Sequence, residues 1–174
     1  MFPDNTVICN LAAVDRLDLL RSVLGRRGRW TEAVAYEASR SARAYPPLSA
    51  LARDPCLGEP IEIGDAADVL RVEQIRRAVF GGTAVEPLRH LGEAQTCYVI
   101  KNWPQFAGSW WVSDDREALR YARFQQITTR ETIDFVSAAV VNGELRASDG
   151  VALMNAMADA GRRLRLPASE RDLR

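Results

Sequence analysis

The sequence predicts an α/β fold, a single three-layer α/β/α domain with a mostly parallel five-stranded sheet between its helices. Two observations support this prediction. Short β-prone runs alternate with amphipathic helices along the chain, an order typical of parallel sheets. The length of 174 residues is enough for one well-filled core and too short for two comfortable domains. We therefore expect one domain over residues 1–165 and an Arg-rich C-terminal tail over residues 166–174.

The five expected strands are short runs that are β-prone, alternating or strongly hydrophobic. The run that contains Trp110 and Trp111 is the most hydrophobic of them. Ligands of such sheets gather at the carboxyl ends of the strands, so polar residues directly after a strand need an explanation. The predicted strands cover residues 6–9, 28–31, 60–64, 109–113 and 126–129.

The helices are predicted from apolar residues that recur every three or four positions. Gly25 ends the first helix, Asp65 is a suitable N-cap for the third, and Pro87 suits the first turn of the fourth. Most of the prolines lie in residues 46–60, which we expect to form a loop with a short helical turn. The Arg-rich end of the chain is expected to fray. The predicted helices cover residues 11–24, 32–44, 66–80, 87–102, 116–124, 132–142 and 148–164.

The overall charge limits the functions that the chain can have. Apolar residues make up 47% and charged residues 26%, an ordinary balance for a globular protein. Lys plus Arg and Asp plus Glu number 23 each, so the formal net charge is zero. A protein that coats nucleic acid by charge alone carries a large positive excess, and this chain does not. The charge does not exclude an enzyme that binds a phosphate backbone through bound cations.

The cysteines and the hydropathy indicate a cytoplasmic protein without a membrane partner. Cys9, Cys56 and Cys97 are scattered and odd in number, which suits reduced thiols better than a disulfide framework. The start of the sequence has no basic region followed by an apolar one, so no secretion signal is visible. No apolar run approaches the length needed to cross a bilayer.

Acidic residues lie at points where a parallel sheet would gather them. Crowded carboxylates repel one another and raise each other's pKa, so such a cluster usually implies a hard cation. Mg²⁺ or Mn²⁺ held by few carboxylates keeps water ligands, which suits the activation of water against a phosphodiester. The acids come from four separate segments: Asp4, Glu37, Glu93, and the group of Asp114, Asp115 and Glu117.

Some of these acids also have simpler interpretations. Glu37 is as well explained by a solvated helix position as by a site. For the group at 114–117 we favour Asp114 as the cap of the next helix and Asp115 as the ligand. Glu117 is better explained as a first-turn acid that compensates the helix dipole.

Four stretches, in order, resemble the motifs of the PIN domain, the nuclease fold of bacterial toxin ribonucleases and RNA-processing nucleases. The resemblance covers roughly residues 1–164. It departs from the usual pattern in the Asp-Asn-Thr order, in the proline-bearing insert and in an extra C-terminal helix. The stretches are Pro3-Asp4-Asn5-Thr6-Val7-Ile8, Trp30-Thr31-Glu32-Ala33-Val34 through Glu37, Gly92-Glu93-Ala94 and Val112-Ser113-Asp114-Asp115-Arg116.

The resemblance implies a Mg²⁺- or Mn²⁺-dependent endoribonuclease, the toxin of a toxin–antitoxin pair with RNA as substrate and a small antitoxin protein as partner. Residues 1–165 would be the PIN-like nuclease domain. The implied catalytic residues are Asp4, Glu37, Glu93 and Asp115. Of these, Asp4, Glu93 and Asp115 would hold the metal, and Glu37 would help to orient the attacking water. Asn5, Ser113 and Asp114 would hydrogen-bond the ligands.

Two alternatives remain for the function. The first is a catalytically weak or inactive PIN-like module that binds nucleic acid or a protein partner. The second is a haloacid-dehalogenase-like hydrolase, but that class expects Asp-x-Asp after the first strand, and here the second position is Thr6. No Gly-rich phosphate loop is present, which excludes a P-loop enzyme.

Two further features have open interpretations. Arg26, Arg27 and Arg29 form the best basic patch for binding the substrate, and a solvated turn explains them equally well. The apolar face of the last helix, which includes Met154 and Met157, is most simply core, with a homodimer interface as the alternative.

Overall fold

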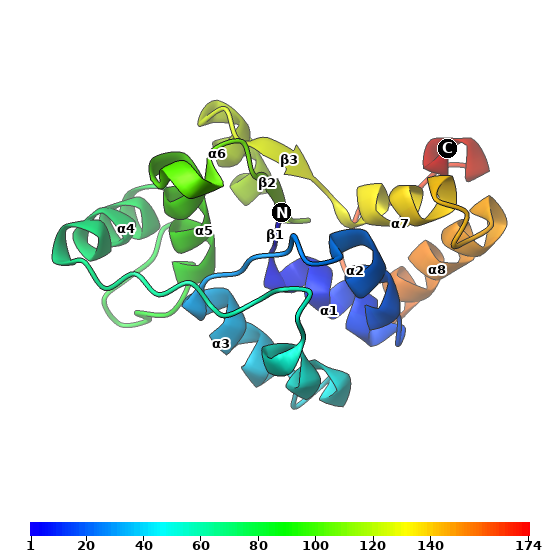
Figure 1. The fold of residues 1–174 in the computed structure, drawn as a ribbon, viewed down its shortest axis with the longest axis horizontal. Helices are drawn as coiled ribbons and strands as arrows, with labels where there is room; N and C mark the ends of the chain where they lie inside the picture. Colours follow the sequence, from blue (N-terminus) through cyan, green and yellow to red (C-terminus); the bar gives the residue numbers. More distant parts are fainter.

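Eight α-helices surround a small three-stranded parallel sheet in the computed structural model, which describes every residue from Met1 to Arg174. The chain is mostly helical, with 57% of its residues in helices. The sheet lies near the centre, with helices α4, α5 and α6 to one side and α2, α7 and α8 to the other (Figure 1). No helix is both long enough and apolar enough to cross a membrane.

The sheet consists of β1 (Phe2–Pro3), β2 (Trp110–Val112) and β3 (Thr128–Arg130), in that order and all parallel. Neighbouring residues of β2 point to opposite faces, as the pleat of a strand requires. Trp111 belongs to the core on the side of α4, α5 and α6, and Val112 to the core on the side of α1, α2 and α7. The sheet therefore separates two hydrophobic cores, and its carboxyl edge lies between them.

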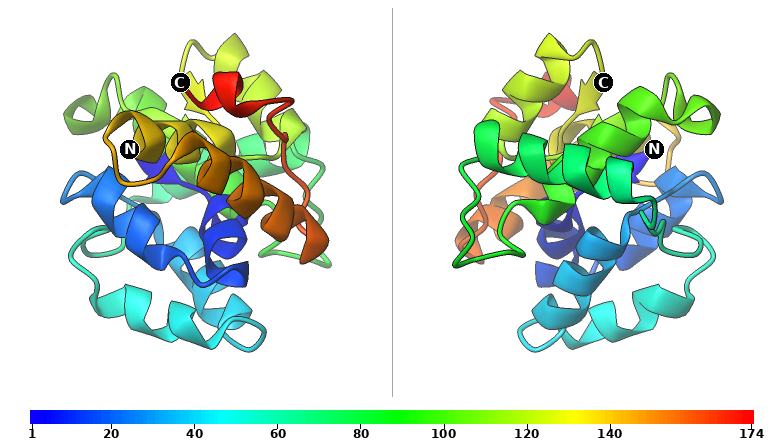
Figure 2. Two further views of the ribbon diagram at one scale, coloured as in Figure 1. Left: turned by 90° about the vertical axis from the view of Figure 1, so that its right-hand side faces the viewer. Right: turned by 90° about the vertical axis from the view of Figure 1, so that its left-hand side faces the viewer.

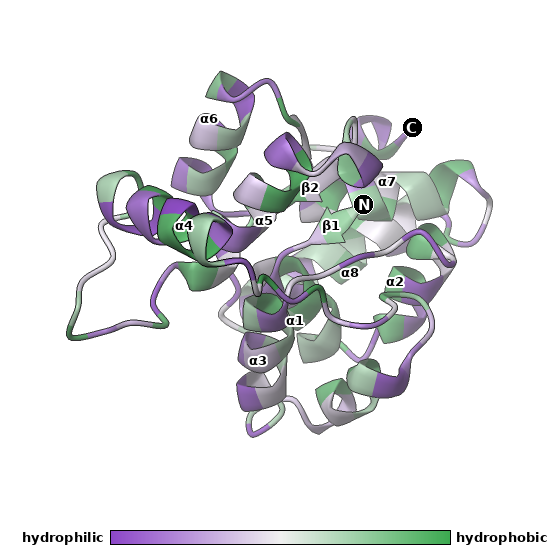
Figure 3. Cartoon of the chain, turned by 60° about the vertical axis from the view of Figure 1, so that its left-hand side comes forward, coloured by the Kyte–Doolittle hydropathy of each residue, from purple (hydrophilic) through white to green (hydrophobic).

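The helices cover the two faces of this sheet. From the two sides of the molecule, α8 is in front in one view and α4 in the other (Figure 2). Hydrophilic residues colour much of the outer helices α3 and α4 (Figure 3). The α-helices are α1 (Asn5–Ala13), α2 (Leu17–Leu24), α3 (Glu32–Ser41), α4 (Ala66–Ala78), α5 (Leu91–Asn102), α6 (Arg116–Phe124), α7 (Thr132–Val141) and α8 (Ala147–Asp159), and the 3₁₀ helices are η1 (Pro46–Arg53), η2 (Pro104–Phe106) and η3 (Glu170–Leu173).

The predicted PIN-like fold, three layers with a five-stranded sheet, is wrong, because the chain is mostly helical and its sheet has only three strands. Residues 28–31 and 60–64 form no strands of the sheet and share one isolated parallel bridge, Thr31 with Ile61. Two backbone hydrogen bonds make this bridge, from Ile61 N to Trp30 O and from Glu32 N to Ile61 O. The pairing stops there because Glu32 already begins α3.

The predicted strand at residues 6–9 is also wrong, since these residues belong to α1. Asp4 caps that helix by accepting a hydrogen bond from Asn5 N. Every residue from 7 to 12 is buried, so the helix shows no polar face and no helical period in the sequence. Val7 and Ile8 are β-branched, but burial on all sides overrides their strand preference. The first strand is instead Phe2–Pro3, directly before Asp4.

Several predicted elements are confirmed with changed ends. α6 has the predicted bounds, and Asp65 caps α4 by accepting from Ala67 N and Asp68 N. The predicted first helix is broken between α1 and α2, where Asp15 has a positive φ of 53°. α5 begins at Leu91 rather than at residue 87, after His90 in the left-handed conformation. The end of the chain does not fray: Leu173 is fully buried, and η3 packs on α7 and α8.

Candidate active site

Asp4 follows β1 at the carboxyl edge of the sheet, whereas the predicted strand at residues 6–9 would have followed it, and its side chain is buried. One carboxylate oxygen accepts hydrogen bonds from the Thr6 hydroxyl (2.9 Å) and the Ser113 hydroxyl (3.0 Å), and the other accepts from Asn5 N (2.8 Å). All three donors are neutral and favour the ionised form. Burial and the neighbouring charge of Glu93 nevertheless raise the pKa of Asp4 to about 6.

Glu37 lies on α3 and faces the same place. Burial, followed by the charges of Asp4 and Glu93, raises the pKa of Glu37 to about 8, against a lowering by a hydrogen bond from the Gly92 backbone. α3 and α5 approach closely at this point. A Cβ atom on Gly92 would lie 3.0 Å from Glu37 Oε1 and 3.1 Å from Val34 Cγ2. A glycine at position 92 therefore lets α5 bring its first turn against Glu37.

Glu93 is in that first turn of α5. Its Oε1 atom lies 3.2 Å from His90 Nδ1, and its side chain is 16% exposed. No Lys or Arg forms an ion pair with Asp4, Glu37 or Glu93, although the charge of Glu93 raises the pKa of both other acids. We call Asp4, Glu37 and Glu93 the acidic trio. They come from the end of β1, from α3 and from α5, and their charges influence one another, whereas Asp115, which was predicted to bind the metal together with Asp4 and Glu93, is not part of the trio.

Ser113 and Asp115 connect β2 to this site. Ser113 Oγ donates to Asp4 and accepts from Asp115 N at 3.1 Å, so it supports a carboxylate as expected. The Asp115 side chain caps α6, because its Oδ1 atom accepts from Glu117 N (2.8 Å) and Ala118 N (2.9 Å). The capping residue is thus Asp115, whereas we favoured Asp114 for that position.

Asp114 has a different position, between α1 and α7. Its carboxylate accepts hydrogen bonds from Asn10 Nδ2 (2.7 Å), Thr132 N (3.0 Å) and the Thr132 hydroxyl. Burial is the main cause of its raised pKa. Asp114 therefore fastens the start of α7 to α1. Asn10 and Thr132 were not predicted as partners of Asp114, because no sequence motif distinguishes them from other polar residues.

The side chains of the remaining predicted residues do not contact the acidic trio. The side chain of Asn5 donates to Ser41 Oγ (3.2 Å) and accepts from Cys9 Sγ (3.4 Å), so it joins α1 to α3. The turn that contains Arg26, Arg27 and Arg29 lies at the start of β1, where Arg29 N donates to Met1 O (2.8 Å). The guanidinium of Arg29 donates to backbone carbonyls of its own turn. The structure does not bring this turn to the carboxyl edge.

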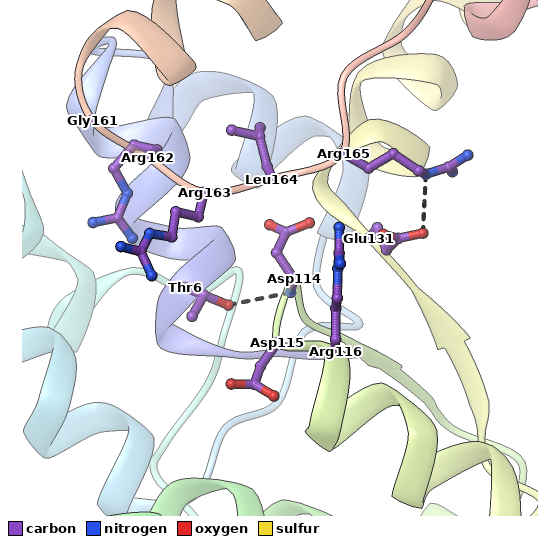
Figure 4. A pocket seen from close by; sticks show the side chains of 10 residues that line it. All are labelled: Thr6, Asp114, Asp115, Arg116, Glu131, Gly161, Arg162, Arg163, Leu164 and Arg165. Atoms are coloured by element: carbon purple, nitrogen blue, oxygen red, sulfur yellow. Dashed lines mark hydrogen bonds and ion pairs between the residues drawn. The ribbon is translucent and has the colours of Figure 1, made fainter.

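A cleft of about 800 Å³ opens beside the carboxyl edge, on the side of α6 and the segment after α8 (Figure 4). Asp114 and Asp115 line it together with Thr6, whose hydroxyl accepts from Asp114 N (3.4 Å) and donates to Asp4. The arginines of this cleft were not predicted as site residues, although most of them form an Arg-rich run in the sequence after α8. The other lining residues are Arg116, Glu131, Gly161, Arg162, Arg163, Leu164 and Arg165.

The chemistry of the donors fits a hard divalent cation. The acidic trio offers only carboxylate oxygens, the ligands that Mg²⁺ and Mn²⁺ prefer, and its like charges lack a Lys or Arg partner. The distances do not form a complete ligand set, because no three His, Cys, Asp or Glu side chains are close enough to surround one ion. Comparison of the chain with protein-family models, curated proteins and solved structures found no match.

Proposed function

We propose that this protein is a metal-dependent endoribonuclease that hydrolyses RNA phosphodiesters. The supporting observation is the acidic trio, which comes from three elements and has no Arg or Lys partner, and in which burial and neighbouring carboxylates raise the pKa values of Asp4 and Glu37. Such crowding costs stability in the protein alone, and a divalent cation offsets that cost. Metal-dependent hydrolysis of this kind needs the carboxylates of the site and does not require a five-stranded sheet.

The residues of the site have distinct roles in this proposal. Asp4 and Glu93 would hold Mg²⁺ or Mn²⁺, with Asp115 contributing the carboxylate oxygen that does not cap α6. When bound, such an ion lowers the pKa of a coordinated water and neutralises charge on the phosphate. Thr6 and Ser113 hold the carboxylate of Asp4 in place. Glu37 would help to orient the attacking water, and its raised pKa of about 8 lets its carboxyl accept a proton during the reaction.

Cleavage of a labelled single-stranded or looped RNA in Mg²⁺ or Mn²⁺ tests this proposal. We expect wild type to cleave, EDTA to stop it, and Asp4→Asn to lower the rate by orders of magnitude, because the amide keeps the size but loses the charge. Glu117→Gln is the matched control, since Glu117 is an exposed residue in the first turn of α6. Equal rates for wild type and Asp4→Asn, or no cleavage of any RNA, would favour a protein that binds nucleic acid or a protein partner without cleaving.

The predicted biological setting follows from the resemblance. A role as the toxin of a toxin–antitoxin pair and an antitoxin partner stay predictions of that kind, and a homodimer and a cytoplasmic location stay predictions from the sequence itself.

A further inference from the structure

Two arginines of the cleft point to how a nucleic-acid strand would bind beside the acidic trio. We infer that Arg116 and Arg163 bind backbone phosphates of a single-stranded nucleic acid in this cleft, an inference that rests on the proposed function for its biological meaning. Arg116 is the first residue of α6, and Arg163 follows the end of α8. In Figure 4 their side chains lie on opposite sides of Asp114.

The segment that carries Arg163 is held in place by its neighbours. Arg162 donates from Nε to Asn10 Oδ1 at 2.7 Å, and its guanidinium lies over the Tyr45 ring at 5.9 Å. Arg165 forms an ion pair with Glu131 at 3.2 Å. These two arginines therefore fix the segment against α1 and the start of α7 and are already partnered within the protein.

Arg116 and Arg163 have no such partners. Both are exposed, and neither side chain forms a hydrogen bond or an ion pair in the protein. Two free guanidinium groups on opposite sides of one cleft provide donors that match phosphate oxygens. The only hydrophobic residue in the lining is Leu164, so the cleft does not suit an apolar ligand.

The position of the cleft favours a nucleic-acid strand over an acidic protein segment. Thr6 lines the cleft and donates a hydrogen bond to Asp4, so a strand that lies between the two arginines passes next to the acidic trio. The carboxylate of Asp114 is covered by hydrogen bonds from Asn10 and Thr132, which weakens its repulsion of a polyanion. An acidic peptide would form ion pairs with the two arginines, but the proximity of Asp4 would not strengthen its binding.

Binding of a short fluorescent RNA and of DNA with the same sequence tests the inference. The titrations are run in EDTA, which prevents metal-dependent cleavage, over a series of salt concentrations. Each phosphate contact on a single strand contributes a slope of about −0.7 to log K against log salt. Arg116→Ala and Arg163→Ala should each flatten the slope by about 0.7, which corresponds to about fivefold weaker binding at 0.1 M salt. Arg27→Ala, an exposed arginine of the turn at the start of β1, is the control and should bind like wild type.

Several results would overturn the inference. They are the absence of binding by wild type, an unchanged slope in both cleft variants, or an equal loss in Arg27→Ala. If the arginine variants bound RNA more weakly but DNA as tightly as wild type, the arginines would contact the ribose rather than phosphate. Displacement of the RNA by oligoglutamate at lower concentrations than by unlabelled RNA would identify a protein-binding cleft. Binding that depends on both arginines in a protein that cleaves no RNA would support the inference and refute the proposed function.

Discussion

Replacing Glu37 by Gln removes the most strongly perturbed acid of the trio with almost no change in size. The pKa of Glu37 rises from 4.5 to about 8, mainly through burial and then through Asp4 and Glu93. A rise of this size corresponds to at most about 5 kcal/mol of lost stability when the carboxyl is fully ionised. The side chain is not fully enclosed, so solvent screening reduces the expected effect to about 2–3 kcal/mol.

The sign of the effect follows from linkage. The folded protein binds the proton of Glu37 more tightly than the unfolded chain does, so this contribution to stability is complete below pH 4.5 and is lost as the pH rises towards 8. In EDTA, the free energy of unfolding of wild type should therefore fall between pH 5 and pH 8.5. In Glu37→Gln the fall should be smaller by about 2–3 kcal/mol, which leaves the variant relatively more stable at alkaline pH.

Urea denaturation of both proteins at a series of pH values gives these free energies directly. Saturating Mg²⁺ should reduce the difference between the two profiles, because bound cation stabilises the ionised carboxyls of wild type. Parallel pH profiles for wild type and Glu37→Gln in EDTA would refute the reasoning, since they would show that Glu37 is ionised without cost in the folded state.

Two further substitutions test the contacts that position the site. Gly92→Ala should destabilise the protein by about 1–3 kcal/mol in urea denaturation because its Cβ would crowd Glu37 and Val34, and Gly64→Ala, which meets nothing within 4 Å, should not. Arg76→Met should cost about 3 kcal/mol by the same assay, because this fully buried guanidinium holds the loop before α5 through backbone carbonyls. Arg77→Met should cost at most about 1 kcal/mol, since its ion pair is exposed. Equal costs for the two arginine variants would contradict this role.

Three of the four acids proposed for the site could be found from the sequence, whereas the order and number of the strands could not. Asp4 was predicted beside a first strand at residues 6–9, whereas it follows the strand Phe2–Pro3 and caps α1. The error has a physical cause: the buried residues of α1 leave no helical period, and their β-branched side chains resemble a strand. Residues 28–31 and 60–64 have strand-like composition, but they pair only once because α3 begins at Glu32.

The basic residues illustrate a second limit. Arg162 and Arg163 were predicted to lie in a helix over residues 148–164, because nothing local shows that α8 ends at Asp159 and that Arg162 reaches Asn10 on α1. Only the fold brings positions 10 and 162 together. Arg26 and Arg27 stood out because they are adjacent, yet their turn lies at the other end of β1 from Asp4.

Titration with Mn²⁺, followed by electron paramagnetic resonance of the free ion, tests most directly whether the acidic trio is a metal site. We predict that wild type binds Mn²⁺ and so decreases the free-ion signal, and that Asp4→Asn and Glu93→Gln each bind Mn²⁺ at least about tenfold more weakly. Glu117→Gln should bind like wild type, since its carboxyl lies outside the trio. Wild type that leaves the free-ion signal unchanged, or trio variants that bind Mn²⁺ as tightly as wild type, would contradict the account.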